Sequence, residues 1–390
     1  MSSRDIVLLS TADWDNPFWT NKQHVAVELA QKGNRVLYID SLGLRRPSAS
    51  TRDLLRIGKR LIKAARPPRK VRDNLWVWSP IVLPWHGNST VRKINRLLLN
   101  SGLWLSLKIL RMRQEWLWTY NPLTTEFFNF SNYQQTIYHC VDEIKAQPGM
   151  PVETLESAEK KLASQVDIIF TTSPRLTETR KLWNKNTYYF PNVADYNHFS
   201  TARSEQTKIP SDISTIAGPR IGFIGAISGY KVDFTLLRQV ATARPDWSLV
   251  LIGDIGEGDP WTDSSQLKGL KNIHLLGPRP YSTLPSYLKG LDVALLPNNV
   301  NEYTDSMFPM KFFEYLSAGK PVVSVNLKAI QDFSDVASIA RSEEEFISAI
   351  EKALNGGAPP LEQRLATAKE YTYEARTKKM LNLIEEGISA

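Results

Sequence analysis

The residues best suited to chemistry lie in the segment 305–324, which reads DSMFPMKFFEYLSAGKPVVS. Pro309 is favourable near the start of a helix, because the N–H that it lacks would be unpaired there anyway. The N-terminus of that helix, at residues 307–310, would offer free N–H groups and a positive dipole end, which suit a diphosphate. Glu314 lies one turn further along, where its carboxylate can accept two hydrogen bonds from a ribose diol. The competing interpretation is a solvated helix carboxylate that binds nothing.

Glycines and cations that follow other predicted strands would complete such a site. A glycine turn at 225–229 follows the predicted strand 220–224, and Lys231 comes next. Arg279 and Tyr281 follow another predicted strand, where they either flank a base or form a simple surface turn. Donors and cations of this kind neutralise phosphate charge, so we expect neither a metal nor another cofactor. The predicted diphosphate and ribose site comprises Gly225, Ser228, Gly229, Lys231, Arg279, Tyr281, Ser306, Met307, Phe308, Pro309, Lys311 and Glu314.

The elements that must position these residues are strands alternating with helices, twice along the chain. In the first half the predicted strands are 6–10, 36–40, 75–79, 116–120, 136–140 and 167–172. In the second half they are 220–224, 248–253, 273–276, 292–296 and 321–325. This alternation implies parallel sheets with right-handed crossovers, whose ligands bind beyond the carboxyl ends of the strands. We therefore predict an α/β chain with two Rossmann-like domains that face each other across a cleft.

The domain boundaries follow from composition. Residues 1–195 form the predicted N-terminal domain, and its first helix has a capping-box pattern at Thr20 and Gln23. Residues 196–217 are polar, lack periodicity and are interpreted as a linker. Residues 218–370 form the predicted second domain. Residues 371–390 are predicted to form a C-terminal helix that packs back toward the first domain.

Length and composition exclude several classes of protein. The chain has 390 residues, of which 42% are hydrophobic and 23% charged, as in ordinary globular proteins of two domains. A single cysteine, Cys140, excludes an intrachain disulfide and a multi-cysteine metal site. The first residues lack a signal-peptide layout, and the apolar stretch 97–107 is too short to span a bilayer. We expect a reducing, cytoplasmic location.

Positive charge is concentrated in one window. The whole chain carries a formal net charge of +8, whereas residues 45–113 contain 17 Lys/Arg against two Asp, or +15. Within this window a predicted helix has Leu54, Ile57 and Leu61 on one face. Its basic residues are Arg52, Arg56, Lys59, Arg60, Lys63 and Arg66. The pattern predicts peripheral binding to an anionic membrane; the alternative is a solvated surface helix, and we expect no nucleic-acid partner.

Glu-Tyr-Leu-x-Ala-Gly-Lys-Pro-Val-Val, preceded by Pro-x-Lys, resembles the nucleotide-sugar motif of GT-B glycosyltransferases, in the retaining family 4 group. Four further segments resemble the same family in order: 171–176, 190–199, 220–237 and 273–297. Asp13-Trp14 and the YHCVDE turn are similar to the branch of group 1 glycosyltransferases that makes teichuronic acid. The resemblance implies a GT-B fold and transfer of a hexosyl group from a nucleoside diphosphate sugar, with retention and without metal.

The resemblance also assigns roles to single residues. It implies that His139, at the end of a predicted strand, contacts the transferred sugar and is catalytic together with Glu314; the alternative is a structural histidine. Asp13, Trp14, Asn16 and Asp142 would lie on the acceptor side, where Trp14 either stacks on a sugar or anchors its loop. The implied acceptor is lipid-linked or a polysaccharide, at the inner face of the cytoplasmic membrane.

Three departures from the family pattern are visible. The family often has two glutamates separated by seven residues, and Ser306 stands where the first would lie. Val193 directly follows Asn192 where the family has a glycine, and only Lys231 represents an expected basic pair. Two alternatives therefore stay open: a GT-B sugar-nucleotide epimerase, and a catalytically silent protein that binds sugar nucleotides.

Overall fold

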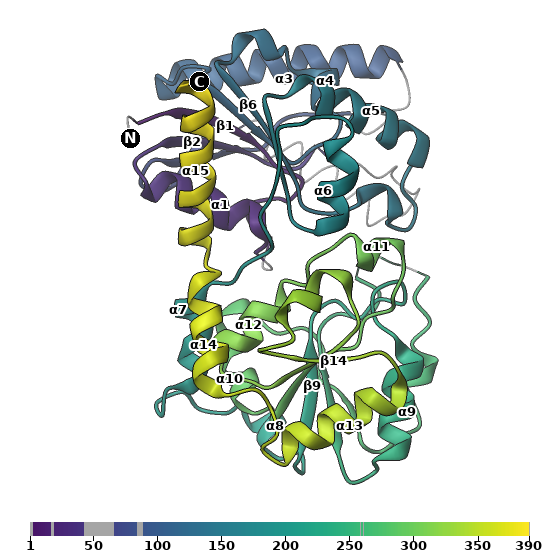
Figure 1. Ribbon diagram of the computed structural model, residues 1–390. Coiled ribbons are helices and arrows are strands. Elements are labelled where there is room, and N and C mark those ends of the chain that lie inside the picture. The colour runs from purple at the N-terminus through teal and green to yellow at the C-terminus, as the bar shows by residue number, and fades with distance from the viewer. Residues whose placement is uncertain are drawn as a thin grey trace. The chain divides into compact units, whose positions relative to one another are not determined.

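The computed structural model of this chain describes residues 3–16, 19–42, 66–83, 89–257, 259 and 261–389. The chain divides into two compact units, and each is described by itself. Unit 1 comprises residues 1–172, 176–190 and 380–390, and unit 2 comprises residues 173–175 and 191–379. Both are α/β units built on largely parallel sheets with helices on the two faces (Figure 1). The predicted α/β class with two Rossmann-like domains is confirmed.

Unit 1 contains an eight-stranded sheet in the order β3-β4-β2-β1-β5-β6-β7-β8. Its strands are β1 (Asp5–Leu9), β2 (Arg35–Ile39), β3 (Arg69–Arg72), β4 (Leu75–Trp78), β5 (Trp116–Thr119), β6 (Gln135–Cys140), β7 (Ile168–Thr171) and β8 (Thr187–Tyr189). Only β3 is antiparallel to its neighbour. The sequence did not predict β3 or β8. The first reads RKVR and carries the charges typical of an edge strand, and the second is three residues long, so neither shows an apolar run.

Helices cover both faces of this sheet. They are α1 (Asn21–Gln31), α3 (Ser89–Leu110), α4 (Thr124–Phe127), α5 (Val152–Gln165) and α6 (Pro174–Lys181). The predicted capping box at the start of α1 is confirmed, since the Thr20 N–H donates to Gln23 Oε1 at 3.1 Å. On one face α1 packs in a core with Ile6 and Leu8, and on the other α3 packs against Val7 and Leu9. The end of α15 (Tyr373–Ser389) joins the α1 core through Met380, Leu381 and Ile384.

Unit 2 contains a six-stranded parallel sheet in the order β11-β10-β9-β12-β13-β14. Its strands are β9 (Arg220–Ile224), β10 (Ser248–Ile252), β11 (Ile273–Leu275), β12 (Val293–Leu296), β13 (Val322–Val325) and β14 (Ser338–Ala340). Numbered within the unit, this is the order 3-2-1-4-5-6 of a dinucleotide-binding Rossmann sheet. The strand order reverses between β9 and β12, and ligands of such sheets bind at that point.

Eight α-helices of unit 2 surround this sheet or lead into it. They are α7 (Tyr196–Ser200), α8 (Ser211–Ser214), α9 (Phe234–Ala243), α10 (Leu284–Lys289), α11 (Glu302–Asp305), α12 (Lys311–Ser317), α13 (Glu343–Leu354) and α14 (Leu361–Glu370). Phe312, Phe313 and Leu316 of α12 pack inward, as the sequence predicts. The opposite face of the sheet is covered by α9 and α13.

The segment 196–217 is not a linker, and this prediction is wrong. Residues 196–203 form α7 and a following 3-10 turn, and Phe199 and Ala202 are buried in the core of unit 2. Ile213 of α8 joins the same core. The three buried apolar residues of this segment are separated by polar residues and do not recur every 3.6 positions. The sequence therefore shows no amphipathic helix pattern here.

We predict that Phe199→Ala destabilises unit 2 by about 3–5 kcal/mol, because it empties a fully buried site. The matched control is Asn197→Ala, two residues away on the exposed side of α7, which should change the free energy of unfolding by less than about 0.5 kcal/mol. Urea unfolding followed by circular dichroism measures both. Equal stability of the two variants would restore the linker interpretation.

Candidate active site

The ends of β9 and β10 in unit 2 approach each other closely, next to the point where the sheet reverses its order. Gly225 follows β9 and Gly253 follows β10, and the Gly225 N–H donates to the Ile252 carbonyl at 2.9 Å. Gly253 has a φ of +156°, and a Cβ there would lie 1.8 Å from the Gly225 carbonyl oxygen. Only glycine fits at this position. The two glycines therefore leave the backbone at this edge of the sheet without side chains. A bulky ligand needs such an open approach to the backbone.

The turn that follows β9 is tied to a neighbouring loop. The Gly229 N–H donates to Thr262 Oγ1 at 3.1 Å, and the buried Ser228 hydroxyl donates to the Glu257 carbonyl. Both predicted phosphate donors are thus already engaged. Lys231 is placed differently, because its ammonium lies 5.1 Å and 5.5 Å from the ring centroids of Tyr230 and Tyr303. These cation–π contacts leave the charge of Lys231 available to an anion.

The predicted helix start at 307–310 is wrong, because α12 begins at Lys311 with Met310 as its N-cap. The residues before it form the separate helix α11, whose N-cap Asn301 has a capping box with Thr304. The N–H of Met307 donates to the Thr304 carbonyl, so the turn uses a donor that we expected to be free. Asn301 and Thr304 do not match the Ser/Thr-x-x-Glu/Gln pattern, which is why the short helix escaped prediction.

Residues from distant parts of the sequence hold the loop between α11 and α12. The Ser173 hydroxyl donates to the Ser306 carbonyl at 3.0 Å, and Asn192 Nδ2 donates to the Phe308 carbonyl at 2.6 Å. The Phe308 ring is buried and stacks on Phe313 at 5.2 Å, so it belongs to the core and not to a ligand surface. Ser173 and Asn192 were not predicted as site residues, although both lie in segments that resemble the family.

Ser306 stands where the resemblance to the family implies a glutamate. Its side chain is fully buried. The part of the chain that the structure describes gives its hydroxyl no hydrogen-bond partner.

Glu314 is 3% exposed, so the competing interpretation of a solvated carboxylate is wrong. Its Oε2 lies 2.8 Å from Lys311 Nζ, and Lys311 is one turn earlier on α12. Burial raises the pKa of Glu314, while the charges of Lys311 and His198 counteract that rise and Asp195 adds to it. Glu314 is therefore an anion in a poorly hydrated position, and its partner Lys311 is a cation with access to solvent.

Aromatic residues lie near Glu314. The Tyr281 ring stacks on His198 with 4.5 Å between centroids and 14° between planes, and His198 Nε2 lies 2.9 Å from the Tyr281 carbonyl oxygen. Burial is the main cause that raises the pKa of Tyr281, followed by the charge of Glu314. Burial is also the main cause that raises the pKa of Tyr373, while the charge of Arg376 lowers it and that of Glu314 adds to the rise. The structure thus brings Tyr281, Lys311 and Glu314 together, as predicted, and adds His198, which was not among the predicted site residues.

Arg279 is not a simple surface arginine, and whether it flanks a base stays a prediction. Its Nη2 pairs with Asp212 at 2.7 Å and its Nε donates to the Tyr287 hydroxyl at 2.6 Å. Asp212 lies in the segment predicted to be a linker. Arg279 therefore fastens that segment to unit 2, a role that could not be predicted while the segment was thought to be unpacked.

In unit 1, His139 lies in β6 with its side chain fully buried. Its ring stacks on Tyr120 at 4.9 Å and meets the edges of Trp118 and Phe170 at 5.9 Å and 6.1 Å. An aromatic cluster therefore surrounds the predicted catalytic histidine. This environment favours the structural alternative for His139.

Trp14 is 7% exposed, and its backbone N–H donates to Asp40 Oδ1 at 2.7 Å. Its ring contacts Trp19 and Tyr38 at 5.1 Å and 5.2 Å, which favours the loop anchor over stacking on a sugar. The Asp13 carbonyl accepts the backbone N–H of Asn16, so these two predicted acceptor residues stabilise the same turn.

The turn that carries Asp142 is held by a buried ion cluster. Arg180 makes two hydrogen bonds to Glu143, at 2.7 Å and 2.9 Å, and pairs with Glu159 at 2.7 Å. Asp142 itself is partly exposed, and its Oδ2 lies 4.0 Å from Lys22 Nζ. Of the two acids that follow β6, only Asp142 can thus reach a ligand, because Glu143 is fully committed to Arg180.

The remaining predicted residues belong to the basic segment 52–66. Arg66 is exposed, and Arg52, Arg56, Lys59, Arg60 and Lys63 lie outside the described residues. Among the residues that are described, no three His, Cys, Asp or Glu side chains gather to hold a metal ion. The metal-free chemistry stays a prediction.

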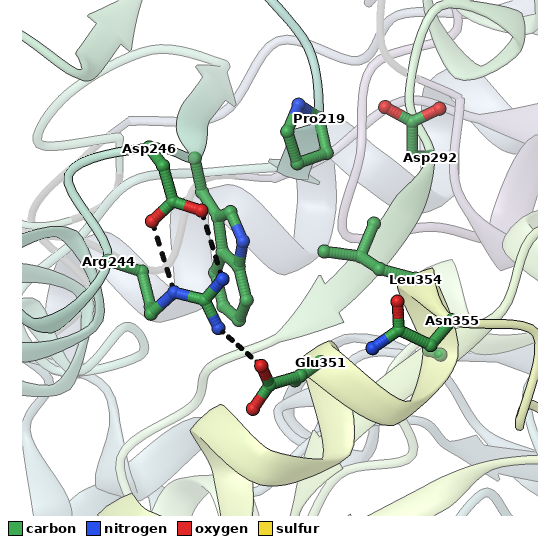
Figure 2. A pocket seen from close by; sticks show the side chains of 9 residues that line it. Pro219, Arg244, Asp246, Asp292, Glu351, Leu354 and Asn355 are labelled. Carbon is green, nitrogen blue, oxygen red and sulfur yellow. Dashed lines mark hydrogen bonds and ion pairs between the residues drawn. The ribbon is translucent and has the colours of Figure 1, made fainter.

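A cavity of about 640 Å³ lies elsewhere in unit 2, at the amino ends of β9, β10 and β12 (Figure 2). Arg244 in its wall stacks on Trp247 at 4.0 Å and pairs with Asp246 and Glu351, both at 2.9 Å. These contacts use all sides of the guanidinium. The cavity is at the edge of the sheet opposite to the candidate site, so we assign it no part in the chemistry.

Comparisons with known proteins agree with this architecture. Residues 218–356 match the family described as Glycosyl transferases group 1. A Bacillus subtilis (strain 168) protein, named as a teichuronic acid biosynthesis glycosyltransferase TuaH, is 28% identical over 279 residues, which are 67% of this chain and 68% of the relative. Sucrose-phosphate synthase from Thermosynechococcus elongatus has a TM-score of 0.69 at 15% identity, over 99% of both chains. HepE of Anabaena, solved with UDP, has a TM-score of 0.64 at 13% identity, over 98% of this chain and 100% of its own.

At such identities the solved structures show the fold alone, and that fold is GT-B. Together with the family match over residues 218–356, it indicates a glycosyltransferase enzyme. More particularly, unit 2 carries the group 1 glycosyltransferase domain, which includes Glu314 and the glycine turn after β9.

We predict that Glu314→Gln does not destabilise the protein at neutral pH. The pKa of Glu314 is raised above its ordinary value of 4.5 in the folded state, so the unfolded chain releases this proton first. Its contribution to stability is complete below about pH 4.5 and is lost as the pH rises through the raised pKa. Thermal unfolding from pH 4 to 8 should show equal stability at the acidic end and a higher Tm of the variant at pH 7.

The control for this series is Glu302→Gln, the same change at an exposed glutamate on the neighbouring helix α11. It should leave the Tm difference from the parent protein close to zero throughout. A Glu314→Gln protein that is less stable at pH 7 would mean that the Lys311 ion pair outweighs the cost of burial.

Proposed function

We propose that this glycosyltransferase takes its sugar from a nucleoside diphosphate sugar and transfers it, with retention and without metal, to a lipid-linked or polysaccharide acceptor. The observation that carries the proposal is the buried carboxylate of Glu314, beside Lys311 and beneath the strand ends of a Rossmann unit. A carboxylate there can accept both hydroxyls of a ribose. The UDP held by the HepE structure supports the donor class, and the name of the Bacillus relative supports a polysaccharide acceptor.

The proposed reaction places charge where this chain has groups to meet it. The bond from the sugar C1 to the diphosphate breaks, and a bond from C1 to the acceptor oxygen forms on the same face. The proton of the acceptor hydroxyl ends on the released diphosphate. Negative charge grows on the leaving group, close to the ammonium groups that Lys231 and Lys311 supply. Asp142, the partly exposed acid of unit 1, is the proposed contact for the acceptor.

A second candidate is a protein that binds sugar nucleotides without transferring the sugar. Ser306 favours it, because a hydroxyl stands where the family often has a carboxylate that contacts the sugar. A GT-B epimerase is the third candidate, and it would need acid and base groups beyond those described here. Turnover separates the three.

We expect a matching nucleoside diphosphate sugar to raise the Tm, since a ligand at 100 times its Kd stabilises the folded state by about 2.7 kcal/mol. A panel that varies base and sugar would identify it in a thermal-shift assay. Glu314→Ala should remove that shift together with donor hydrolysis or transfer, while Glu302→Ala on α11 should keep both. A shift without any turnover would indicate the silent binder, and a full shift in Glu314→Ala would contradict the donor site.

We also propose that the basic segment 52–66 brings the enzyme to an anionic membrane at the cytoplasmic face, where a lipid-linked acceptor would lie. Reversing Arg56, Lys59, Arg60 and Lys63 to Glu should lower binding to phosphatidylglycerol vesicles by roughly tenfold or more, at about 1 kcal/mol per basic residue. Four exposed lysines of unit 2, Lys208, Lys271, Lys352 and Lys378, changed to Glu provide a control of equal charge. Equal losses in the two variants would show only an effect of net charge.

A further inference from the structure

Helix α3 is apolar on two opposite faces. Its 22 residues run as one long helix in unit 1 (Figure 1). Leu99, Leu103 and Leu107 are buried and pack against β1 and β2, which accounts for one face. A surface helix normally needs only one such stripe, with polar residues on the other side.

The opposite face of α3 is apolar and exposed. Leu97 is 69% exposed and Trp104 is 58% exposed, the largest fractions among its hydrophobic residues. Spacings of three, four and seven residues place the set on one stripe, so it forms a continuous apolar strip. Its members are Ile94, Leu97, Leu98, Trp104, Leu105 and Ile109. A strip of this kind on one helix marks an interaction surface.

The charged residues of α3 and of the turn after it are all basic, although Arg92 pairs with Glu126 of α4 at 3.6 Å. Residues 89–113 contain six Lys/Arg and no Asp or Glu. Lys108 Nζ lies 4.2 Å from the centroid of the Trp104 ring, and Lys93 and Arg96 are exposed on the flank of the strip. Apolar side chains and a tryptophan bordered by cations are typical of helices that lie in the headgroup region of an anionic bilayer.

We propose that the exposed face of α3 inserts into an anionic membrane surface, with the helix axis in the membrane plane. Within the described ranges no helix is long and apolar enough to cross a membrane, and α3 has its other face committed to the core of unit 1. A second copy of the chain is the less suitable occupant, because two such faces would bring like charges together. The proposed function supplies only the reason for membrane binding, which is an acceptor carried by the membrane. The inference that α3 binds the membrane does not itself depend on the proposed function.

The test is co-sedimentation of the full-length protein with vesicles of phosphatidylcholine, with and without half phosphatidylglycerol. Leu97→Gln, Trp104→Gln and Ile109→Gln, combined, remove the centre of the strip and leave the net charge unchanged. We expect the partition coefficient on anionic vesicles to fall by roughly tenfold or more. Leu182→Gln with Trp261→Gln, at 83% and 72% exposed positions, is the matched control and should bind as the parent protein does.

Three outcomes decide the matter. Unchanged binding of the triple variant, with an unchanged Tm, would overturn the proposal. A protein that is dimeric without vesicles and becomes monomeric in the triple variant would assign the strip to a second copy and also overturn it. Binding that survives 0.5 M salt in the parent and not in the triple variant would support apolar insertion, because salt screens only the charges. No donor or acceptor is present, so failure of the donor-binding assay and failure of this one are independent.

Discussion

A carboxylate kept away from water is the constraint around which the group 1 domain is arranged. Taking an ionised carboxylate out of water costs several kcal/mol, and one lysine at 2.8 Å offsets only part of it, as the raised pKa of Glu314 shows. A protein that needed only stability would place an apolar residue there. Groups held at such a cost are characteristic of ligand sites, where a bound partner supplies the missing hydrogen bonds. In this enzyme the hydroxyls of a ribose would be that partner.

The surrounding structure fixes the position of that carboxylate from several directions. The Tyr315 hydroxyl, next to Glu314 on α12, accepts the N–H of Ile224 at the end of β9. Ser173 and Asn192 hold the preceding loop by its carbonyl groups. Gly253 permits the close contact of the neighbouring strand end. Helix, loop and strands are thus locked to one another by hydrogen bonds, which is the rigidity that a site needs to hold reacting groups in place.

The sequence predicted the elements well and their ends less well, for a physical reason. Apolar runs and the capping box of α1 are local signals, so the first helix and all strands except β3, β8 and β14 followed from them. The start of α12, the packing of 196–217 and the tie from Arg279 to Asp212 depend on contacts between residues far apart in the chain. In the site, Glu314 and Lys311 were predictable because they share one helix turn. His198, Ser173 and Asn192 were not, since only the fold brings them near.

Unit 1 is also organised around a buried charged group, which in this unit is a guanidinium and not a carboxylate. Arg180 faces Glu143 and Glu159, and the cluster lies directly behind the turn of Asp142. Removing the guanidinium would leave two buried carboxylates unpaired, so this turn cannot move without a large cost. Asp142 is therefore held by its neighbours while its own side chain stays accessible.

Ser306 is a buried residue whose hydroxyl has no hydrogen-bond partner in the described part of the chain. Most buried hydroxyls in this chain donate to a carbonyl, as Ser317 does to Phe313 in the following helix. A buried hydroxyl without a partner costs about 1–3 kcal/mol. In the described part of the chain Ser306 has that cost and no compensation, at the position where the resemblance to GT-B glycosyltransferases implies a glutamate.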